Sequence, residues 1–440
     1  MFAYYLDLAL RSLKRNRGLT ALMIITIGFG VAASMTTWSV FRAVSGDPIP
    51  RKSAKLFVPQ IDNWGPSGHA PGSKSTEPPD AMDYTDAMAL MRAHRARYQS
   101  AIYEIATAVV PERVGESPII ASGAAVYAGF FPMLDVPFRY GSGWSGADDE
   151  HRARVIVIGS HLNDQLFDGA DSVGKTVNLS GHEYRVAGVL DAWHPQPVFY
   201  DVVNTGGFNT RGGDIFIPFT TAIATDTPNN GNTNCNETPK AGFVGLRQSE
   251  CVWIAFMVQL DNAAAVQDYK QFLDNYAAEQ QQAGRFRWPP NTRLRGLMAW
   301  LDAQHVVPPD TRISLYVALG LLLVCLVNVM GLLLAKFMRR SSEIGVRRAL
   351  GASRGEIYSQ FLTEAGMVGL AGGVLGLALT WLGVASVGWV LPRDIASLAH
   401  MNWSLLLLTL IVAIVTTMLA GLYPTLRAAA VQPAWQLKSN

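Results

Sequence analysis

The sequence ISLYVALGLLLVCLVNVMGLLLA, residues 313–335, contains no charged side chain in 23 residues. Similar charge-free runs occupy residues 19–40, 365–390 and 403–423. A helix needs about 20 apolar residues to cross the hydrocarbon core of a bilayer. The sequence therefore predicts a membrane α-helical protein with four transmembrane helices, at residues 19–40, 313–335, 361–390 and 403–423.

The composition of the whole chain is a mixture of these runs with an ordinary soluble segment. The 440 residues are 49% hydrophobic and 16% charged, with a formal net charge of +2, and the mean hydropathy is only +0.17. These values exclude a disordered chain, a disulfide-dense toxin and a basic nucleic-acid coat. Residues 41–312 carry the soluble part, and no nucleic-acid partner is expected.

The lysine and arginine residues near the ends of the predicted helices give the orientation. They lie before the first helix, between the second and third, and after the fourth: Arg11, Lys14, Arg15, Arg17, Lys336, Arg339, Arg340, Arg347, Arg348, Arg354, Arg427 and Lys438. Because positive residues favour the cytoplasmic side, both termini, with the tail 424–440, are expected in the cytoplasm together with segment 336–360. Residues 41–312 and the short loop 391–402 are then outside.

Residues 41–312 are long enough to bury their own core and are predicted to form two α+β lobes. The pattern predicts strands at 154–159, 176–180, 183–189, 214–219 and 253–260, helices at 160–167 and 262–281, and loops at 191–213 and 225–248. Cys235 and Cys251 flank one such loop and are predicted to form a disulfide outside the cytoplasm, with two free thiols as the alternative. Cys325 lies in the second span and is expected to be a small buried apolar residue.

Residues 169–176, GADSVGKT, match the G-x-x-x-x-G-K-[ST] phosphate loop letter for letter. A phosphate loop must lead from a strand into a helix, so that amides at the helix N-terminus meet the phosphates. Here the segment leads into a predicted β-hairpin, and we interpret it as a turn. No motif for a catalytic or metal site occurs elsewhere, so a membrane-anchored hydrolase stays an alternative without positive support.

Residues 336–360, KFMRRSSEIGVRRALGASRGEIYSQ, form a short basic segment between the second and third spans. Ser353 and Glu356 make a capping box that is expected to start the third helix. Gly351 can end a preceding short helix in a left-handed conformation, which predicts a helix at about 342–350. This structured turn favours a docking element for a cytoplasmic partner; a basic topology anchor is the alternative.

Two sides are predicted for this short helix, one with Ile344 and Leu350 and a polar one with Arg347 and Arg348. The N-terminal residues 1–18 are also predicted as an amphipathic helix at the membrane surface, or as the first turns of a longer helix. Its apolar side comprises Phe2, Tyr5, Leu6, Ala9, Leu10 and Leu13.

The third span is rich in glycine, with two G-x-x-x-G pairs that allow close helix contact. The pairs are Gly369 with Gly373 and Gly372 with Gly376. Asn328 is the most polar residue of the second span, and an amide in lipid needs a partner. We expect Asn328 to bond a neighbouring helix, with substrate binding as the alternative.

Four stretches of the chain together resemble one family. Residues 343–377, EIGVRRALGASRGEIYSQFLTEAGMVGLAGGVLGL, are similar to the conserved region of FtsX-like permeases, the MacB and LolC/LolE class of ABC transporter. Residues 420–437 resemble the C-terminal end of that family, and residues 8–32 resemble its start. Residues 154–190 resemble a MacB-type periplasmic core domain. The resemblance implies four spans with a large periplasmic domain between the first two, in the bacterial inner membrane.

The resemblance also implies how such a protein works. These permeases form dimers that pair with two ATPase subunits, and the first two spans make the dimer seam. ATP hydrolysis would move the periplasmic domain, a process called mechanotransmission. The family's ATPase-coupling region corresponds to Glu343, Ile344, Gly345, Val346, Arg347, Arg348, Ala349, Leu350, Gly351 and Ala352.

The chain starts about 18 residues before its first span, so the resemblance implies a separate ATPase polypeptide that binds ATP and Mg, and no cofactor in this chain. The second permease is a further copy or a paralogue. Expected cargo is peptides, antibiotics or lipid-linked molecules, and a periplasmic adaptor and an outer-membrane channel are open as further partners. The alternatives are an FtsX-like transducer that activates a periplasmic cell-wall hydrolase and, third, a sensor partner of a signalling system.

Overall fold

The computed structural model has two compact units, Met1–Gly46 with Pro308–Asn440 and Asp47–Val307. It describes residues 2–64, 77–111, 117–207, 213–307, 309–390 and 403–429. We call the first unit the bundle and the second the core domain. The predicted loop 391–402 and residues 430–440 of the predicted tail lie outside the described residues.

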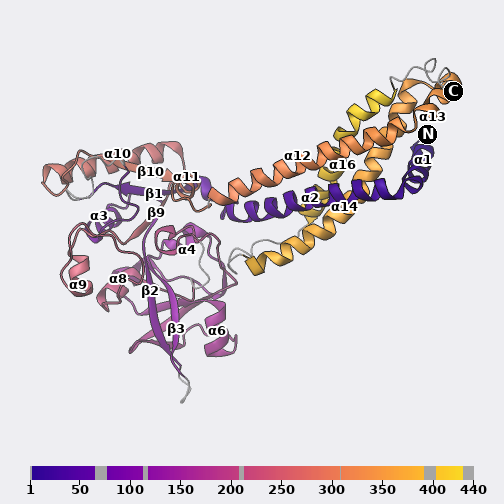
Figure 1. Ribbon diagram of the computed structural model, residues 1–440. Coiled ribbons are helices and arrows are strands. Elements are labelled where there is room, and N and C mark those ends of the chain that lie inside the picture. The colour runs from indigo at the N-terminus through magenta and orange to yellow at the C-terminus, as the bar shows by residue number, and fades with distance from the viewer. Residues whose placement is uncertain are drawn as a thin grey trace. The chain divides into compact units, whose positions relative to one another are not determined.

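Four long helices of the bundle confirm the four predicted spans. They are α2 (Arg17–Ser45), α12 (Pro309–Met338), α14 (Arg354–Val390) and α16 (Trp403–Ala429), and each is long and apolar enough to cross a membrane. Every helix extends beyond its charge-free run, because a helix continues into the headgroup region where charges are tolerated. In Figure 1 these helices run lengthwise beside one another, with α14 packed on α2 and α16.

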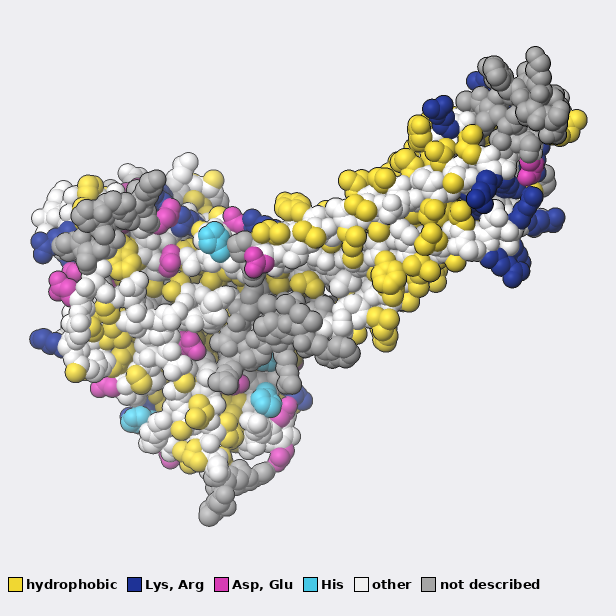
Figure 2. Space-filling view, viewed as in Figure 1, with side chains coloured by type: hydrophobic (Ala, Val, Ile, Leu, Met, Phe, Trp, Pro, Cys, Tyr) yellow, Lys and Arg dark blue, Asp and Glu magenta, His cyan; other side chains and the backbone are white. Residues whose placement is uncertain are grey.

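The interior of the bundle is a single apolar cluster, and its outside is also apolar. The buried cluster includes Met23, Ile27, Val31, Val329, Leu333, Val368 and Ala413. Large apolar side chains such as Leu323, Trp381 and Ile411 are exposed on the outside, and Figure 2 shows hydrophobic side chains along most of the bundle surface. Such a surface suits contact with lipid rather than water.

Two short helices, α1 (Phe2–Arg15) and α13 (Ser341–Ala349), lie at one end of the bundle. Helix α1 ends before Asn16, and α2 starts at Arg17, so α1 is a helix of its own rather than the first turns of α2. Of its predicted apolar side, Ala9 is buried and Leu10 is exposed. The side chains of residues 2–7 lie outside the described set.

The core domain is built on ten strands with helices packed around them. The strands are β1 (Leu56–Ile61), β2 (Tyr98–Val110), β3 (Ile119–Val126), β4 (Phe138–Gly141), β5 (Val155–Ile158), β6 (Thr176–Leu179), β7 (His182–Leu190), β8 (Ile215–Pro218), β9 (Ala255–Gln259) and β10 (Thr292–Gly296). Their order is β10-β1-β9-β2-β3-β8-β5-β7-β4, and β6 pairs with β2 and β7. The helices are α3 (Tyr84–Ala93), α4 (Phe130–Leu134), α5 (Gly146–Glu150), α6 (Ser160–Phe167), α7 (Val202–Thr205), α8 (Phe219–Ala224), α9 (Gly242–Arg247), α10 (Ala263–Gln282) and α11 (Leu297–Ala303), and a 3-10 turn, η1 (Ser53–Lys55), precedes β1.

Strand β2 is long enough to pair with two groups of strands. Its first half pairs with β9, from Tyr98 to Ile102, and its second half pairs with β3, from Tyr103 to Val109. Pairings β3–β8 and β5–β7 are parallel and the rest are antiparallel. The core domain is therefore an α+β unit in which the two groups share one continuous strand.

All five predicted strands and both predicted helices of the core domain are present, within three residues at their ends. The two segments predicted as loops, 191–213 and 225–248, instead contain the short helices α7 and α9. A helix of four to six residues is too short to show an apolar period, which is why the sequence did not indicate these two.

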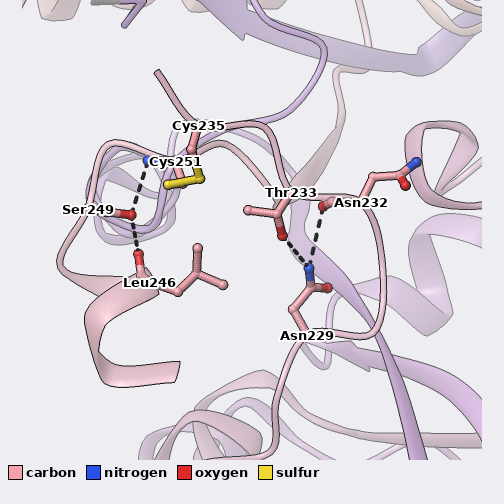
Figure 3. Close-up of a disulfide and its surroundings, with 7 residues drawn as sticks. All are labelled: Asn229, Asn232, Thr233, Cys235, Leu246, Ser249 and Cys251. Atoms are coloured by element: carbon pink, nitrogen blue, oxygen red, sulfur yellow. Dashed lines mark hydrogen bonds between the residues drawn. A yellow bond between two sulfur atoms is a disulfide. The ribbon is translucent and has the colours of Figure 1, made fainter. Parts of the chain in front are cut away.

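A disulfide between Cys235 and Cys251 closes the loop that carries α9. Figure 3 shows the pair beside Ser249, whose Oγ accepts a hydrogen bond from the Cys251 amide at 3.2 Å and donates to the Leu246 carbonyl at 2.7 Å. The adjacent Asn234 and Val252 exchange two backbone hydrogen bonds of 3.0 and 2.9 Å. The covalent link thus fixes both ends of this loop to one another, as the sequence predicts for this pair.

Removal of the disulfide should destabilise the core domain. A Cys235→Ala, Cys251→Ala double variant frees a loop spanning a sequence separation of 16, and closure of a loop of this size contributes about 3 kcal/mol in the chain-entropy description. Urea unfolding of isolated residues 47–307 measures the loss. An unchanged unfolding midpoint would show that the link adds no stability; the wild-type protein under reducing conditions is the control.

Asp201 is a buried carboxylic acid in the core domain. Its Oδ1 accepts a hydrogen bond from the Asn204 amide at 2.6 Å. Burial raises the pKa of Asp201 to about 7, while the Asn204 hydrogen bond opposes the rise and the charge of Glu104 adds to it. The folded protein therefore holds this proton over a pH range in which the unfolded chain has released it.

This proton makes the stability of the core domain depend on pH. The folded-state pKa is raised, so stability is greatest below the unfolded pKa near 3.8 and falls as the pH rises to about 7. Between about pH 5 and pH 7.5, Asp201→Asn should lose about 2 kcal/mol less unfolding free energy than the wild type. Urea unfolding of residues 47–307 at the two pH values tests this; equal losses would rule out a buried neutral Asp201.

Candidate functional site

The predicted coupling segment forms a rigid corner between α12 and α14. Helix α13 ends at Ala349, and Gly351 adopts a φ of +98°. The Ala352 amide donates to the Arg347 carbonyl at 3.0 Å and the Gly351 amide donates to the Arg348 carbonyl at 3.1 Å. These two hydrogen bonds together form a Schellman motif, which ends a helix at a glycine in the left-handed conformation.

The next helix begins immediately with the predicted capping box. The Ser353 amide donates to Glu356 Oε2 at 2.8 Å, and the Glu356 amide donates to Ser353 Oγ at 3.2 Å. Both the helix end and the helix start are therefore as predicted. Only the four residues 350–353 separate the capped end of α13 from the capped start of α14, so α13 cannot turn freely relative to α14.

One side of α13 packs into the bundle. Ile344 is buried and belongs to the same apolar cluster as Ile357 and Phe361 of α14. Phe361 in turn contacts Phe337 of α12, with ring centroids 4.2 Å apart. The inner side of α13 is thus buried in the apolar interior of the bundle through Ile344.

The opposite side of α13 presents two apolar residues to the surroundings. Val346 is 57% exposed and Leu350 is 83% exposed, and they lie one helical turn apart. The prediction that Leu350 shares an apolar side with Ile344 is wrong. Residues six positions apart are rotated by about 240° in a helix of 3.6 residues per turn, so they cannot share a face.

The predicted coupling residues divide by exposure. Ile344 and Gly345 are buried; Glu343, Arg347, Arg348 and Ala352 are half-buried; Val346, Ala349, Leu350 and Gly351 are exposed. Glu343 accepts hydrogen bonds from Arg347 at 3.0 Å and from Arg340 at 3.3 Å. Arg347 also donates to Gln360 of α14 at 3.0 Å. Arg347, predicted on the polar side of this helix, thus links Glu343 to α14.

A charged cluster that was not predicted from the sequence lies beneath α13. Glu364 of α14 is fully buried and forms an ion pair with the fully buried Lys336 of α12. Both residues flank charge-free runs on the apolar side of the basic segment, which is the signal that could have drawn attention to them. Figure 2 shows lysine and arginine side chains gathered at this end of the bundle.

The glycines of α14 bring three helices close together. A Cβ added to Gly369 would lie 2.9 Å from the Ala413 carbonyl oxygen of α16, and one added to Gly373 would lie 3.0 Å from the Ala413 Cβ. Gly372 and Gly376 instead face α2, at Ile27 and Gly28. The two G-x-x-x-G pairs therefore serve two different faces of α14.

Within the described residues, Asn328 forms no hydrogen bond with another helix of this chain, so its bond to a neighbouring helix stays a prediction. Asn328 is exposed on the outside of α12, and no side-chain hydrogen bond is recorded for it among the described residues. A Cβ added to Gly320 or Gly331 on the same helix would meet no atom within 4 Å. This face of α12 thus has a polar side chain at Asn328 and no side chain at Gly320 and Gly331.

The segment that matches a phosphate loop is a turn, as interpreted from the sequence. Gly169 and Gly174 have positive φ values, and Thr176 starts strand β6 rather than a helix. Lys175 lies over the Phe167 ring, 4.8 Å from its centroid. No helix N-terminus follows the glycines, so the geometry that binds a phosphate is missing here.

Comparison with known proteins identifies both parts of the chain. Residues 20–276 match the MacB-like periplasmic core domain, and residues 315–433 match the FtsX-like permease C-terminal region. The pyoverdine export ATP-binding/permease protein PvdT of Pseudomonas aeruginosa is 27% identical over 70% of this chain and 41% of its own length. The macrolide export ATP-binding/permease protein MacB of Escherichia coli K12 is 24% identical over 97% of this chain and 59% of its own length.

The chain spans about half the length of these curated relatives. Among solved structures, the periplasmic region of MacB from Actinobacillus actinomycetemcomitans covers 57% of this chain at 12% identity, with 92% of that structure matched and a TM-score of 0.35. The extracellular domain of the transporter YknZ from Gram-positive bacteria covers 54% of this chain at 12% identity, with 99% of that structure matched and a TM-score of 0.34.

Proposed function

The chain belongs to the family of ABC-type permeases that join a MacB-like periplasmic core domain to an FtsX-like C-terminal region, and we propose that it is the permease of an ATP-driven export system. The relatives named above are export proteins for pyoverdine and for macrolides, which supports export as the direction of work. The proposed cargo is a peptide, an antibiotic or a lipid-linked molecule taken up from the periplasm.

The observation that carries this proposal is the outward pair formed by Val346 on α13 and Leu350 at its C-cap. Single exposed apolar residues are common, but these two lie one turn apart on a helix whose other side is fixed to α12 and α14. A rigid apolar projection of this kind can fill a pocket of a partner and pass force from it. The proposed partner is a cytoplasmic ABC ATPase dimer, supplied by a separate polypeptide, that binds ATP and Mg.

This assignment requires both termini and α13 on the cytoplasmic side, which the concentration of lysine and arginine at that end supports. Force received at α13 passes to α12 and α14 through Ile344, and from α14 to α2 across Gly372 and Gly376. Helices α2 and α12 continue along the chain into the two ends of the periplasmic core domain. Movement of these two helices is the proposed route of mechanotransmission.

The outer face of α12 is proposed as the seam with a second permease, either another copy or a paralogue. Asn328 is exposed there, and an amide facing lipid is costly without a hydrogen-bond partner. Gly320 and Gly331 leave room for a second helix at close range. A pair of such faces would satisfy the asparagine and bury the glycines.

Purification from native membranes in mild detergent, with the bound proteins identified by mass spectrometry, tests the proposed function. An ABC ATPase with a periplasmic adaptor and an outer-membrane channel supports export. An ATPase with a cell-wall hydrolase supports the alternative of an FtsX-like transducer. Recovery of the chain without any ATPase, under conditions that preserve a related permease complex, would contradict both.

A further inference from the structure

A ring of charged and polar groups surrounds the base of α13. From Glu364 of α14 it runs to Arg340, whose Nη1 lies 3.4 Å from Glu364 Oε2. Arg340 Nε donates to Glu343 Oε2 at 3.3 Å. Arg347 Nη2 donates to Glu343 Oε1 at 3.0 Å, and Arg347 Nη1 donates to Gln360 Oε1 at 3.0 Å.

The ring closes on one face of α14. Gln360 and Glu364 are four residues apart, one turn of the same helix. Helix α13 is therefore tied to α14 at two points separated by one turn. The cavity between Arg340, Arg347 and Gln360 is only about 10 Å³, no more than the space of a single water molecule, so these groups pack closely at the base of α13.

Glu364 joins two further helices to this ring. Its Oε1 forms the ion pair with Lys336 of α12 and accepts a hydrogen bond from Ser12 of α1. Arg340 Nη1 also donates to Ser12 Oγ at 2.9 Å. One buried carboxylate thus contacts groups from α1, from α12 and from the start of α13.

A buried ion pair is an unusual choice for holding helices together. The side chains of Lys336 and Glu364 are both 0% exposed, and the Lys336 ammonium has no other acceptor within the described residues. Apolar residues of the same size usually stabilise such a position as well or better. An ion pair adds specificity instead, because it favours one arrangement of the helices and makes arrangements that separate the charges costly.

We infer that Glu364 is a positioning residue, which sets the angle of α13 and links the movement of α13 to α1 and α12 through Arg340, Ser12 and Lys336. This inference rests on the proposed docking of an ATPase to α13, and it adds the N-terminal helix α1 to the moving parts. Loss of Glu364 together with Lys336 should leave a folded bundle in which α13 follows the ATPase without moving α12.

The test uses the full chain in lipid nanodiscs, alone and with its co-purified ATPase. In the Lys336→Leu, Glu364→Leu double variant, ATPase binding should be unchanged. Amide hydrogen exchange of α13 should be faster by roughly tenfold, and the ATP-driven change in exchange of the periplasmic domain should fall by roughly tenfold. Lys336→Arg should keep most of the wild-type response, because it preserves the ion pair.

Arg340→Gln removes the ion pairs of Arg340 with Glu343 and Glu364. It tests the inference if the double variant does not fold. Arg339→Gln, at the exposed neighbouring position, is the matched control and should behave as wild type. Wild-type exchange of α13 in Arg340→Gln and in the folded double variant would overturn the inference. The exchange of α13 is measured without the ATPase, so its result does not depend on docking. If the proposed docking is wrong, the wild-type protein binds no ATPase, which is a separate observation.

Discussion

Replacing Glu364 alone by leucine is expected to destabilise the bundle by about 3–5 kcal/mol, because the change leaves Lys336 buried without a counter-charge. Its Nζ has no second acceptor among the residues that the structure describes. The ammonium must then lose its proton or draw water into the bundle, and either adjustment costs free energy. Thermal unfolding in detergent, followed by the helical circular dichroism signal, measures the loss.

Two comparisons identify the cause of that loss. Asp310→Leu removes a carboxylate from an exposed position at the start of α12 and should change the unfolding free energy by no more than about 1 kcal/mol. Adding Lys336→Leu to Glu364→Leu should recover most of the lost stability, since no charge is then left buried. A double variant as unstable as the single one would show that packing volume, rather than charge, holds these helices.

The second large effect is expected at the outward side of α13. A Val346→Asp, Leu350→Asp double variant should weaken ATPase binding by roughly a hundredfold or more, because two apolar anchors would carry charges into the interface. Both side chains are mainly exposed in the structure, so the bundle itself should keep its stability. Binding of the co-purified ATPase to permease in nanodiscs, measured at several ATPase concentrations, gives the affinity.

A matched variant separates docking from the fold of α13. Ala349→Asp places one such charge at an exposed position of α13 outside the Val346–Leu350 pair and should weaken binding much less. Thermal unfolding of all variants checks that the bundle is intact. Wild-type affinity in the Val346→Asp, Leu350→Asp protein would remove this pair from the docking surface.

The parts of the structure that the sequence predicted depend on neighbouring residues. The four spans follow from uninterrupted apolar runs, and the ends of α13 follow from Gly351 and from the Ser353–Glu356 capping box, both of which act within one helical turn. The β6–β7 hairpin follows from alternation on both sides of a glycine turn. The pairing of Cys235 with Cys251 follows because only two cysteines lie outside the spans.

The missed parts depend on residues far apart in the chain or on partners. Strand β2 is buried on both faces along its first half, so its sequence lacks a simple alternation of apolar and polar residues. The pair Lys336–Glu364 is separated by 28 positions and meets only when α12 and α14 pack. Asn328 was predicted to bond a neighbouring helix, and it faces outward, where a helix of a second permease would have to supply the partner.

The central claim is that an ABC ATPase docks on the outward side of α13. A photo-crosslinking amino acid at Leu350, introduced in the full chain in living cells, tests this most directly, with Leu319 on the lipid-facing side of α12 as the control position. Light should join Leu350, but not Leu319, to a nucleotide-binding ATPase identified by mass spectrometry. No ATPase adduct at Leu350, or an equal yield from Leu319, would contradict the claim.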